Sequence, residues 1–256
     1  MIDPRAVIDP AAQLAPDVTV GPYSVIGPDV FIGAGTWIGP HVVIRGHTRI
    51  GEQNKIYQFA SVGDDPQDKK YKGERTLLEV GDRNVIRESC TINRGTVQGG
   101  GVTRIGDDNW IMAYVHIAHD CIIGNNTILV NNASLAGHVT IEDHVILGGF
   151  SLVHQFCSVG EYAFTSMASG VAKDVPPYVR VAGHMAEPYG LNSEGLKRHG
   201  FTPETVTQLR RAYKIIYRSN LTADKAVDRL RELAQECPEV ERLAAFIERS
   251  KRGIVR

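Results

Sequence analysis

An aliphatic side chain recurs at every sixth position along most of this chain. The positions fall in three runs, 8 to 62, 80 to 92 and 105 to 171, and 24 of the 25 are Ile, Leu or Val. A helix repeats its buried face about every 3.6 residues and a strand about every 2 residues, so neither explains a period of six. A hexapeptide repeat is typical of a parallel β-helix, in which each repeat supplies one short strand and one bend.

Three repeats form one triangular coil, and the coils stack about 4.8 Å apart through parallel strand pairing. The repeated aliphatic side chains then form a continuous core that no single coil could bury alone. Positions separated by three repeats are therefore expected to lie above one another. The sequence predicts an all-β domain of stacked coils over residues 1–187, followed by a helical domain over 188–256.

Two interruptions of the period predict loops that leave the surface of the coils. The first run ends at Val62 and the next begins at Val80, one full coil further on, so segment 64–79 is expected to replace a coil without loss of phase. The second gap is one position longer than two repeats and contains three consecutive glycines, which predicts an extruded loop near 97–104. Loops on a rigid scaffold often carry function.

The period ends after Val171, and helix signals follow. A short helix is expected from Leu191 to Arg198. Thr202 precedes a Pro at the first helical position of the next, and Thr222 is the predicted N-cap of a third. The tail from 188 carries 14 Lys and Arg against 9 Asp and Glu. This charge suits an acidic partner or a solvated helical surface, and without a basic stripe interleaved with aromatics we expect no nucleic-acid binding.

Chemistry-bearing residues concentrate at one predicted edge of the coils. Gly137 lies one coil after His119, and His138 lies one coil after Asp120, so the four should converge. An Asp beside a His can hold the imidazole in one tautomer, which makes it a general base near neutral pH. A bare glycine lets its N–H approach an oxyanion. This set suits acyl transfer to a hydroxyl, and the next coil would add His154 and Gln155.

Three other interpretations are open on spacing alone. The nine His residues could supply a three-His zinc site, as in γ-class carbonic anhydrases. The histidines at predicted turns could be ordinary exposed polar residues, as we expect for His41, His47 and His144. The β-helix could also be a scaffold with no catalytic site.

At these positions the sequence resembles the UDP-N-acetylglucosamine acyltransferases, from Met1 to Arg256. The segments that carry the resemblance are His116-Ile-Ala-His119-Asp120, Leu135-Ala-Gly137-His138-Val139, Val153-His154-Gln155-Phe156-Cys157, Asp174-Val-Pro-Pro-Tyr178, Arg94-Gly-Thr-Val-Gln-Gly-Gly and Asn192 to Phe201. The resemblance implies a left-handed β-helix and a homotrimer with sites between subunits. It also implies transfer of an (R)-3-hydroxyacyl chain from acyl carrier protein to the 3-hydroxyl of UDP-GlcNAc, the first step of lipid A biosynthesis.

The same resemblance implies a role for each site residue. His119 would be the general base, Asp120 would orient it, and the Gly137 N–H would stabilise the thioester oxyanion. The remaining residues would bind the sugar, its phosphates or the nucleotide, and they are Gln67, Asp68, Lys70, His116, His138, His154, Gln155, Asn192, Glu194 and Arg198. No metal or cofactor is expected, because the thioester already carries the activation. The acidic acyl carrier protein would then be the partner of the basic tail.

Three positions depart from the family pattern. Met167 stands where some members have Gly at the floor of the acyl cleft, so we expect a chain near ten carbons rather than fourteen. Asn93 replaces a usual His and His199 a usual Arg, which leaves open a 3-amino UDP-sugar as the acceptor or weaker phosphate contacts. The sequence shows neither a signal peptide nor an apolar span of membrane length, and we expect a cytoplasmic protein.

Overall fold

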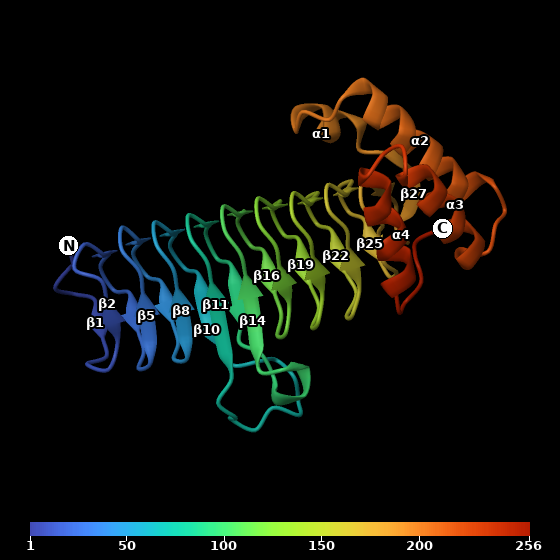
Figure 1. The fold of residues 1–256 in the computed structure, drawn as a ribbon. Helices are drawn as coiled ribbons and strands as arrows, with labels where there is room; N and C mark the ends of the chain where they lie inside the picture. The colour runs from blue at the N-terminus through green and yellow to red at the C-terminus, as the bar shows by residue number, and fades with distance from the viewer.

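The computed structural model describes residues 1–256, which form a prism of stacked coils and a helical tail (Figure 1). The prism has three parallel sheets. Sheet 1 contains β1 (Val7–Ile8), β4 (Val25–Ile26), β7 (Val43–Ile44), β10 (Ser61–Asp64), β13 (Thr91–Asn93), β16 (His116–Ile117), β19 (Ser134–Leu135), β22 (Leu152–Val153) and β25 (Gly170–Val171). Sheet 2 contains β2 (Gln13–Leu14), β5 (Val30–Ile32), β8 (Thr48–Ile50), β11 (Leu77–Val80), β14 (Val102–Ile105), β17 (Ile122–Ile123), β20 (Thr140–Ile141) and β23 (Ser158–Val159). Sheet 3 contains β3 (Thr19–Val20), β6 (Trp37–Ile38), β9 (Lys55–Ile56), β12 (Val85–Ile86), β15 (Trp110–Ile111), β18 (Ile128–Leu129), β21 (Ile146–Leu147), β24 (Phe164–Thr165), β26 (Val179–Ala182) and the antiparallel β27 (Glu187–Leu191).

The coils stack in the register that the hexapeptide period predicts. Ile117 of β16 pairs with Leu135 of β19, which is three repeats further along the chain. Of the 25 repeat positions, 23 are buried, and the two exceptions lie in the first coil at the open end of the stack. Thr165, the one polar member, satisfies its hydroxyl by a 2.7 Å hydrogen bond to Ser151. The repeated side chains are therefore the core of the prism.

The corners between sheets carry the backbone geometry that closes each coil. We call them corner 1–2, corner 2–3 and corner 3–1 after the sheets that they join. Most corners contain one non-glycine residue with positive φ, such as Asp120 at 61° and His138 at 63° on corner 1–2. Asp and His are among the side chains that tolerate this left-handed region best. Corner residues therefore point outward, in columns along the prism.

Both interruptions of the period are insertions at corner 1–2, and the expectation that 64–79 replaces a whole coil was wrong. Val80 does not stack on Val62; it lies in the next sheet and pairs with Ile50, a partner further back in sequence than one coil. Ile92 pairs with Ile117, which is likewise more than one coil away in sequence because the second loop is inserted between them. The two loops leave the prism side by side, and the second contains the 3-10 turn η1 (Val97–Gly99) (Figure 1).

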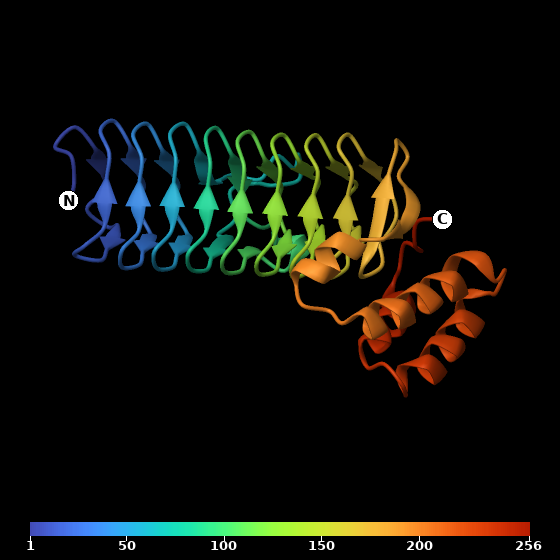
Figure 2. The same cartoon turned by 90° about the horizontal axis from the view of Figure 1, so that it is seen from above.

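The tail folds into four helices beside the C-terminal end of the prism (Figure 2). They are α1 (Ser193–Arg198), α2 (Pro203–Arg218), α3 (Ala223–Ala234) and α4 (Glu239–Arg249). The Thr202 hydroxyl caps α2 by accepting from the Thr205 N–H, whereas Thr222 makes no such bond at α3. The first helix is shorter than expected, because Leu191 belongs to β27. Fifteen buried residues, almost all from the tail, form a second core, and the domain division at 187 stays a prediction.

The last residues return from the tail to the prism and close its C-terminal end. The Ser250 hydroxyl donates to the Asp174 carboxylate at 2.6 Å. Backbone bonds then join Asp174 N–H to the Gly253 carbonyl and Val255 N–H to the Asp174 carbonyl. We call residues 250–256 the closing strap, because they add a bridge beside the final coil.

Candidate functional site

Corner 1–2 brings together the four residues that were predicted to converge. They are His119, Asp120, Gly137 and His138. His119 Nδ1 lies 2.8 Å from Asp120 Oδ2, and His138 Nε2 lies 3.7 Å from the same oxygen. The backbone N–H of His138 also donates to the His119 carbonyl across one coil, at 3.0 Å. The Asp120 side chain is only 1% exposed, whereas that of His119 keeps 15% exposure. The carboxylate is therefore enclosed while the imidazole reaches the surface.

Asp120 is held as a carboxylate by several donors. Burial acts to raise its pKa, but hydrogen bonds from His119 and Thr96 outweigh burial and lower the pKa below its ordinary value. An ionised carboxylate accepts hydrogen bonds only, so the proton in the pair lies on His119 Nδ1. The other ring nitrogen, Nε2, is then left with a free lone pair. This is the arrangement that a general base requires.

Gly137 lies directly against this ring. A Cβ at this position would stand 2.5 Å from His119 Cε1 and 2.7 Å from Nε2, so only glycine allows the ring to lie here. The Gly137 N–H has no hydrogen-bond acceptor in the protein. A free N–H donor therefore lies beside the nitrogen that would accept a proton, which is the relation expected between an oxyanion donor and a base.

His138 forms the outer side of the site. Its ring meets that of His119 edge-on and stacks on Phe156 with ring centroids 4.4 Å apart. Burial lowers the His138 pKa, and His119 lowers it further, whereas the carboxylates of Asp120 and Asp68 act in the opposite direction. His138 is thus kept neutral near pH 7, when its ring offers one N–H donor and one nitrogen acceptor.

An apolar groove of about 460 Å³ begins beside this corner and crosses the outer face of sheet 1. His116 of β16 lies at its edge, where its Nδ1 is 2.7 Å from the Thr91 hydroxyl and where burial and His119 lower its pKa. His154 also lines the groove, and Gln155 lies next to it at the surface. The other lining residues are mostly apolar and are Ser134, Leu135, Ala136, Leu152, Val153, Gly170, Val171, Ala172, His184 and Met185.

The loop that contains Gln67, Asp68 and Lys70 is tied to the prism at its base. Arg94, buried at 8% exposure, donates to the Gly63 carbonyl at 2.6 Å and to the Tyr71 hydroxyl at 3.0 Å, and also pairs with the Asp65 carboxylate.

Asn93 is a second tie at the base of this loop. Its amide donates to the Asp65 carbonyl at 2.8 Å, and the side chain is buried. In this chain Asn93 therefore holds the 64–79 loop. Its Oδ1 has no partner in the protein.

The remaining predicted residues lie on other corners of the same chain. Asn192 caps α1 and donates from its amide to the Tyr162 carbonyl on corner 2–3, and exposed Glu194 and Arg198 follow on that helix. His199 packs there against His144, which is therefore not a free surface residue. Met167 lies on corner 3–1 and is 80% exposed. One chain therefore does not assemble the whole predicted set.

The zinc interpretation conflicts with the hydrogen bonds that Asp120 accepts. The ligand atoms of His119, Asp120 and His138 lie within 4.8 Å of one another. However, Asp120 already accepts from the Thr96 N–H, the Thr96 hydroxyl and His119. Its oxygens are therefore committed to hydrogen-bond donors rather than aimed at a shared cation.

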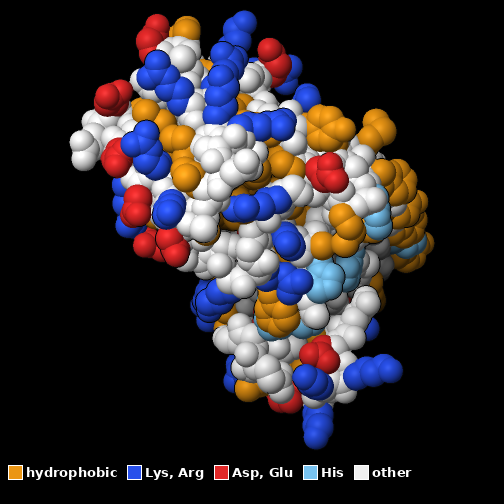
Figure 3. Space-filling view, turned by 90° about the vertical axis from the view of Figure 1, so that its right-hand side faces the viewer, with side chains coloured by type: hydrophobic (Ala, Val, Ile, Leu, Met, Phe, Trp, Pro, Cys, Tyr) orange, Lys and Arg blue, Asp and Glu red, His pale blue; other side chains and the backbone are white.

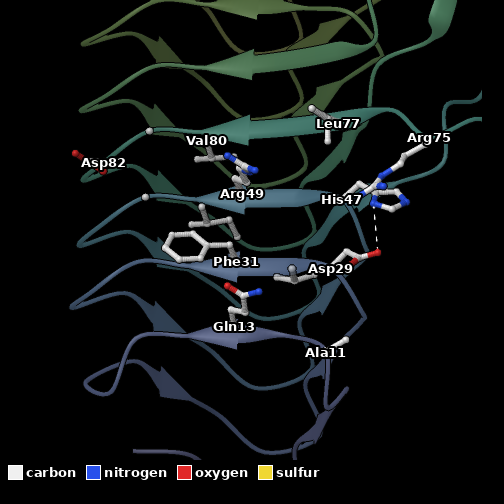
Figure 4. Close-up of a pocket in the computed structure, with 14 residues that line it drawn as sticks. Ala11, Gln13, Asp29, Phe31, His47, Arg49, Arg75, Leu77, Val80 and Asp82 are labelled. Carbon is white, nitrogen blue, oxygen red and sulfur yellow. Dashed lines mark ion pairs between the residues drawn. The ribbon is translucent and has the colours of Figure 1, made fainter.

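A larger groove, about 590 Å³, lies on sheet 2 nearer the N-terminus (Figure 4). Outward side chains of successive strands line it, among them Phe31, Arg49 and Leu77, and His47 lies 3.5 Å from Asp29 at its rim. None of the predicted site residues takes part. Size alone therefore does not mark the site in this protein.

The sequence analysis did not identify the residues that hold Asp120 in place, nor those that hold the 64–79 loop. Thr96 and Gly99 of the second loop and Thr103 of β14 surround Asp120, and the period identifies the loop only as an extrusion. Arg94 belongs to a motif that carries the resemblance, without a predicted role. The sequence signal that could have found them was the run of three glycines at 99–101, in the loop one coil before His119. Glycines in a loop often mark a close approach to neighbouring residues.

Comparisons with known proteins agree with this site. Residues 174–255 match the family described as Udp N-acetylglucosamine O-acyltransferase, Domain 2, and residues 29–64 and 102–137 match the bacterial transferase hexapeptide repeats. An acyl-[acyl-carrier-protein]–UDP-N-acetylglucosamine O-acyltransferase of Alkalilimnicola ehrlichii is 60% identical, covering 100% of this chain and 99% of the relative. The protein of the same description from Thiobacillus denitrificans is 58% identical with the same coverage.

Solved structures are similar throughout their length. The UDP-N-acetylglucosamine acyltransferase of Francisella novicida has a TM-score of 0.98 at 46% identity, covering 100% of this chain and 94% of the other. The UDP-N-acetylglucosamine O-acyltransferase of Moraxella catarrhalis also has a TM-score of 0.98, at 48% identity, with coverage of 100% and 99%. The fold is the left-handed parallel β-helix with a helical tail, as predicted. None of the helices is long and apolar enough to cross a membrane.

Proposed function

Because the chain belongs to the UDP-N-acetylglucosamine O-acyltransferase family, we propose that it moves a 3-hydroxyacyl chain from acyl carrier protein to the 3-hydroxyl of UDP-GlcNAc, with His119 as the general base. The reaction is the first step of lipid A biosynthesis. The observation that carries the proposal is the geometry of corner 1–2: a carboxylate-bound imidazole with a free nitrogen beside an unpaired backbone N–H.

In this mechanism His119 Nε2 takes the proton of the sugar 3-hydroxyl, and the oxygen attacks the thioester carbonyl carbon. The negative charge that develops on the carbonyl oxygen is stabilised by the Gly137 N–H. As the tetrahedral intermediate collapses, the carbon–sulfur bond breaks and the imidazolium returns its proton to the leaving sulfur. Asp120 keeps the imidazole in the required tautomer and stabilises its charged form. The thioester supplies the activation, so the proposed reaction uses no metal or cofactor.

The apolar groove on sheet 1 supports binding of the acyl chain next to the base. It begins at His116, the first residue of the strand that leads to His119, and its lining is mostly aliphatic. Burying a hydrocarbon chain there contributes about 0.8 kcal/mol for each methylene. Met167 lies on the far corner of the same sheet, and the proposed preference for ten carbons depends on its side chain shortening the channel between subunits.

The dispersal of the predicted residues over three corners supports a homotrimer with shared sites. Corner 1–2 carries the base and the Asp68–Lys70 loop, whereas α1 with Asn192, Glu194 and Arg198 lies on corner 2–3. In the proposed trimer, a nucleotide sugar contacts one set from each of two neighbouring chains. The outward faces of sheets 1 and 3 also expose apolar residues, such as Leu152 and Trp110, that suit self-association.

The helical tail supports binding of the acidic carrier protein. Lys and Arg side chains are spread over its surface with fewer Asp and Glu among them (Figure 3). An excess of positive charge raises the rate of encounter with an acidic partner and makes that rate sensitive to salt. We propose that the reaction takes place in the cytoplasm, where acyl carrier protein and nucleotide sugars are found.

The test is acyl transfer to UDP-GlcNAc from ten-, twelve- and fourteen-carbon 3-hydroxyacyl carrier proteins, with the wild type beside His119→Asn. General-base catalysis contributes about 10²-fold or more, so His119→Asn is expected to lose at least that in kcat. His41→Asn is the matched control, because His41 is an exposed corner histidine stacked between Tyr23 and Phe59.

Three outcomes would redirect the assignment. Wild-type turnover in His119→Asn would remove His119 as the base. Preference for the 3-amino analogue of UDP-GlcNAc in a competition assay would change the acceptor while keeping the same catalytic site. Bound zinc in the purified protein, measured by elemental analysis, with loss of activity on its removal would favour the metal alternative.

A further inference from the structure

We infer that Thr96 is a positioning residue for the transfer reaction, because it fixes the Asp120 carboxylate in the orientation that holds the His119 proton on Nδ1. The inference rests on the proposed function, in which His119 is the base. Thr96 immediately precedes η1 in the second loop, well before Asp120 in sequence, and is 1% exposed.

Thr96 holds both oxygens of the carboxylate. Its backbone N–H donates to Asp120 Oδ1 at 2.8 Å, and its hydroxyl contacts Oδ2 at 2.6 Å. Hydrogen bonds to a charged acceptor are shorter and stronger than neutral ones. Two bonds from one residue to the two oxygens of a carboxylate prevent rotation about its χ2, and this rotation would otherwise carry Oδ2 away from His119.

The direction of the hydroxyl proton follows from a third bond. The Gly99 N–H donates to Thr96 Oγ1 at 3.2 Å, so that oxygen acts there as an acceptor. The carboxylate has no proton to give, so the Thr96 hydroxyl donates to Oδ2. Oδ2 therefore accepts from Thr96 on one side and from His119 Nδ1 at 2.8 Å on the other.

The loop encloses this carboxylate because Gly99 has no side chain. A Cβ at Gly99 would overlap the Asp120 carboxyl group, although the backbone there has an ordinary φ. The Thr103 hydroxyl accepts from the Asp120 N–H at 2.8 Å and holds the corner backbone at φ 61°. The loop thus excludes water from the carboxylate and leaves His119 as its link to the substrate.

A residue that acts in this way affects turnover rather than substrate binding. Thr96 is buried beneath Asp120 and lines neither groove, so the acyl chain does not touch it. Without its hydroxyl the carboxylate loses one partner and its charge is less compensated. An imidazolium next to it is then harder to deprotonate, so the acid limb of the pH profile moves to higher pH.

The experiment compares Thr96→Val and Thr96→Ser with the wild type in steady-state transfer across pH. Loss of one charge-assisted bond is expected to lower kcat about 10-fold or more in Thr96→Val, with KM for both substrates changed less than about 2-fold. The acid limb of kcat/KM moves to higher pH, and Thr96→Ser restores kcat to within about 3-fold of the wild type. Wild-type kcat and an unmoved profile in Thr96→Val would overturn the inference.

Thr127→Val is the control for the loss of a buried hydroxyl. Its Oγ1 donates to Asn109 Oδ1 at 2.7 Å on another corner, with no link to Asp120. If Thr127→Val lowers kcat and moves the pH profile as much as Thr96→Val, the effect is general destabilisation and the positioning role fails.

Gly99→Ala tests the orientation of the Asp120 carboxylate by a second substitution, because its added methyl group would push against that carboxylate. It replaces Thr96→Val as the test if that variant does not fold. It is expected to lower kcat and to move the acid limb without changing KM. Unchanged kcat would contradict the inferred enclosure of Asp120. His119→Asn separates this inference from the proposed function: an inactive His119→Asn beside a fully active Thr96→Val removes only the role of Thr96, whereas an active His119→Asn removes the base itself.

Discussion

Gly137→Ala tests how far the His119 ring can be displaced before catalysis is lost. The added methyl group would stand 2.5 Å from His119 Cε1, whereas ordinary contacts of a Cβ begin at 3.4 Å. The ring must therefore move by about 1 Å, and a displacement of about 1 Å in a catalytic group costs about 10²-fold in rate. The Gly137 N–H is kept, and the backbone there does not have positive φ. We expect kcat to fall about 100-fold with KM for UDP-GlcNAc nearly unchanged.

The assay is steady-state transfer from the ten-carbon carrier protein, with thermal unfolding measured in parallel. Gly149→Ala is the matched control, because a Cβ there meets only the Asn131 carbonyl at 3.4 Å and Val130 at 3.6 Å. It should keep wild-type kcat. A kcat for Gly137→Ala within about 3-fold of the wild type, in a folded protein, would refute the placement of the base against this glycine.

Three further predictions concern the 64–79 loop, the acyl channel and the half-buried histidines of the site. Met167→Gly should extend acceptance toward fourteen carbons and slow the ten-carbon donor only modestly, as competition between the two donors would measure. Arg94→Gln should raise KM for UDP-GlcNAc about 10-fold with a smaller change in kcat, because it removes the ion pair that holds the 64–79 loop at Asp65. A KM equal to that of the wild type would contradict this role of Arg94. The pKa values of His116 and His138 are lowered in the folded protein, so the unfolded chain binds more protons and the free energy of unfolding should fall as pH drops below about 6.5. Denaturant titrations at pH 7.5 and 5.5 would measure this fall. A His116→Asn variant should lose less free energy of unfolding between the two pH values than the wild type.

The hexapeptide period predicted the coils, their register and the meeting of His119 with Gly137, because a fixed repeat converts sequence separation into distance. The handedness and the roles of individual residues came from resemblance. The period located both interruptions but not the register after the first loop: a gap of three repeats fits a segment that replaces a coil as well as one inserted at a corner. Val80 was therefore assigned to the wrong sheet.

Thr96 and Arg94, which hold the site residues in place, were harder to predict than the site residues themselves. The separation of Thr96 from Asp120 is not a whole number of coils, because the inserted loop shifts the register between them. Arg94 likewise reaches back to Gly46 and Gly63 across the other insertion. Such contacts depend on how a loop folds back, which no periodic pattern encodes.

The closing strap has a consequence for assembly. A stack of parallel coils ends in unpaired strand edges, and these edges are templates on which another molecule can add. Residues 250–256 pair with Asp174 and cover part of that edge, and the four helices lie beside it. Head-to-tail polymerisation into a fibre needs both ends of the stack open. The strap thus occupies the strand edge at Asp174, so a second molecule cannot pair with that edge by continuing the stack.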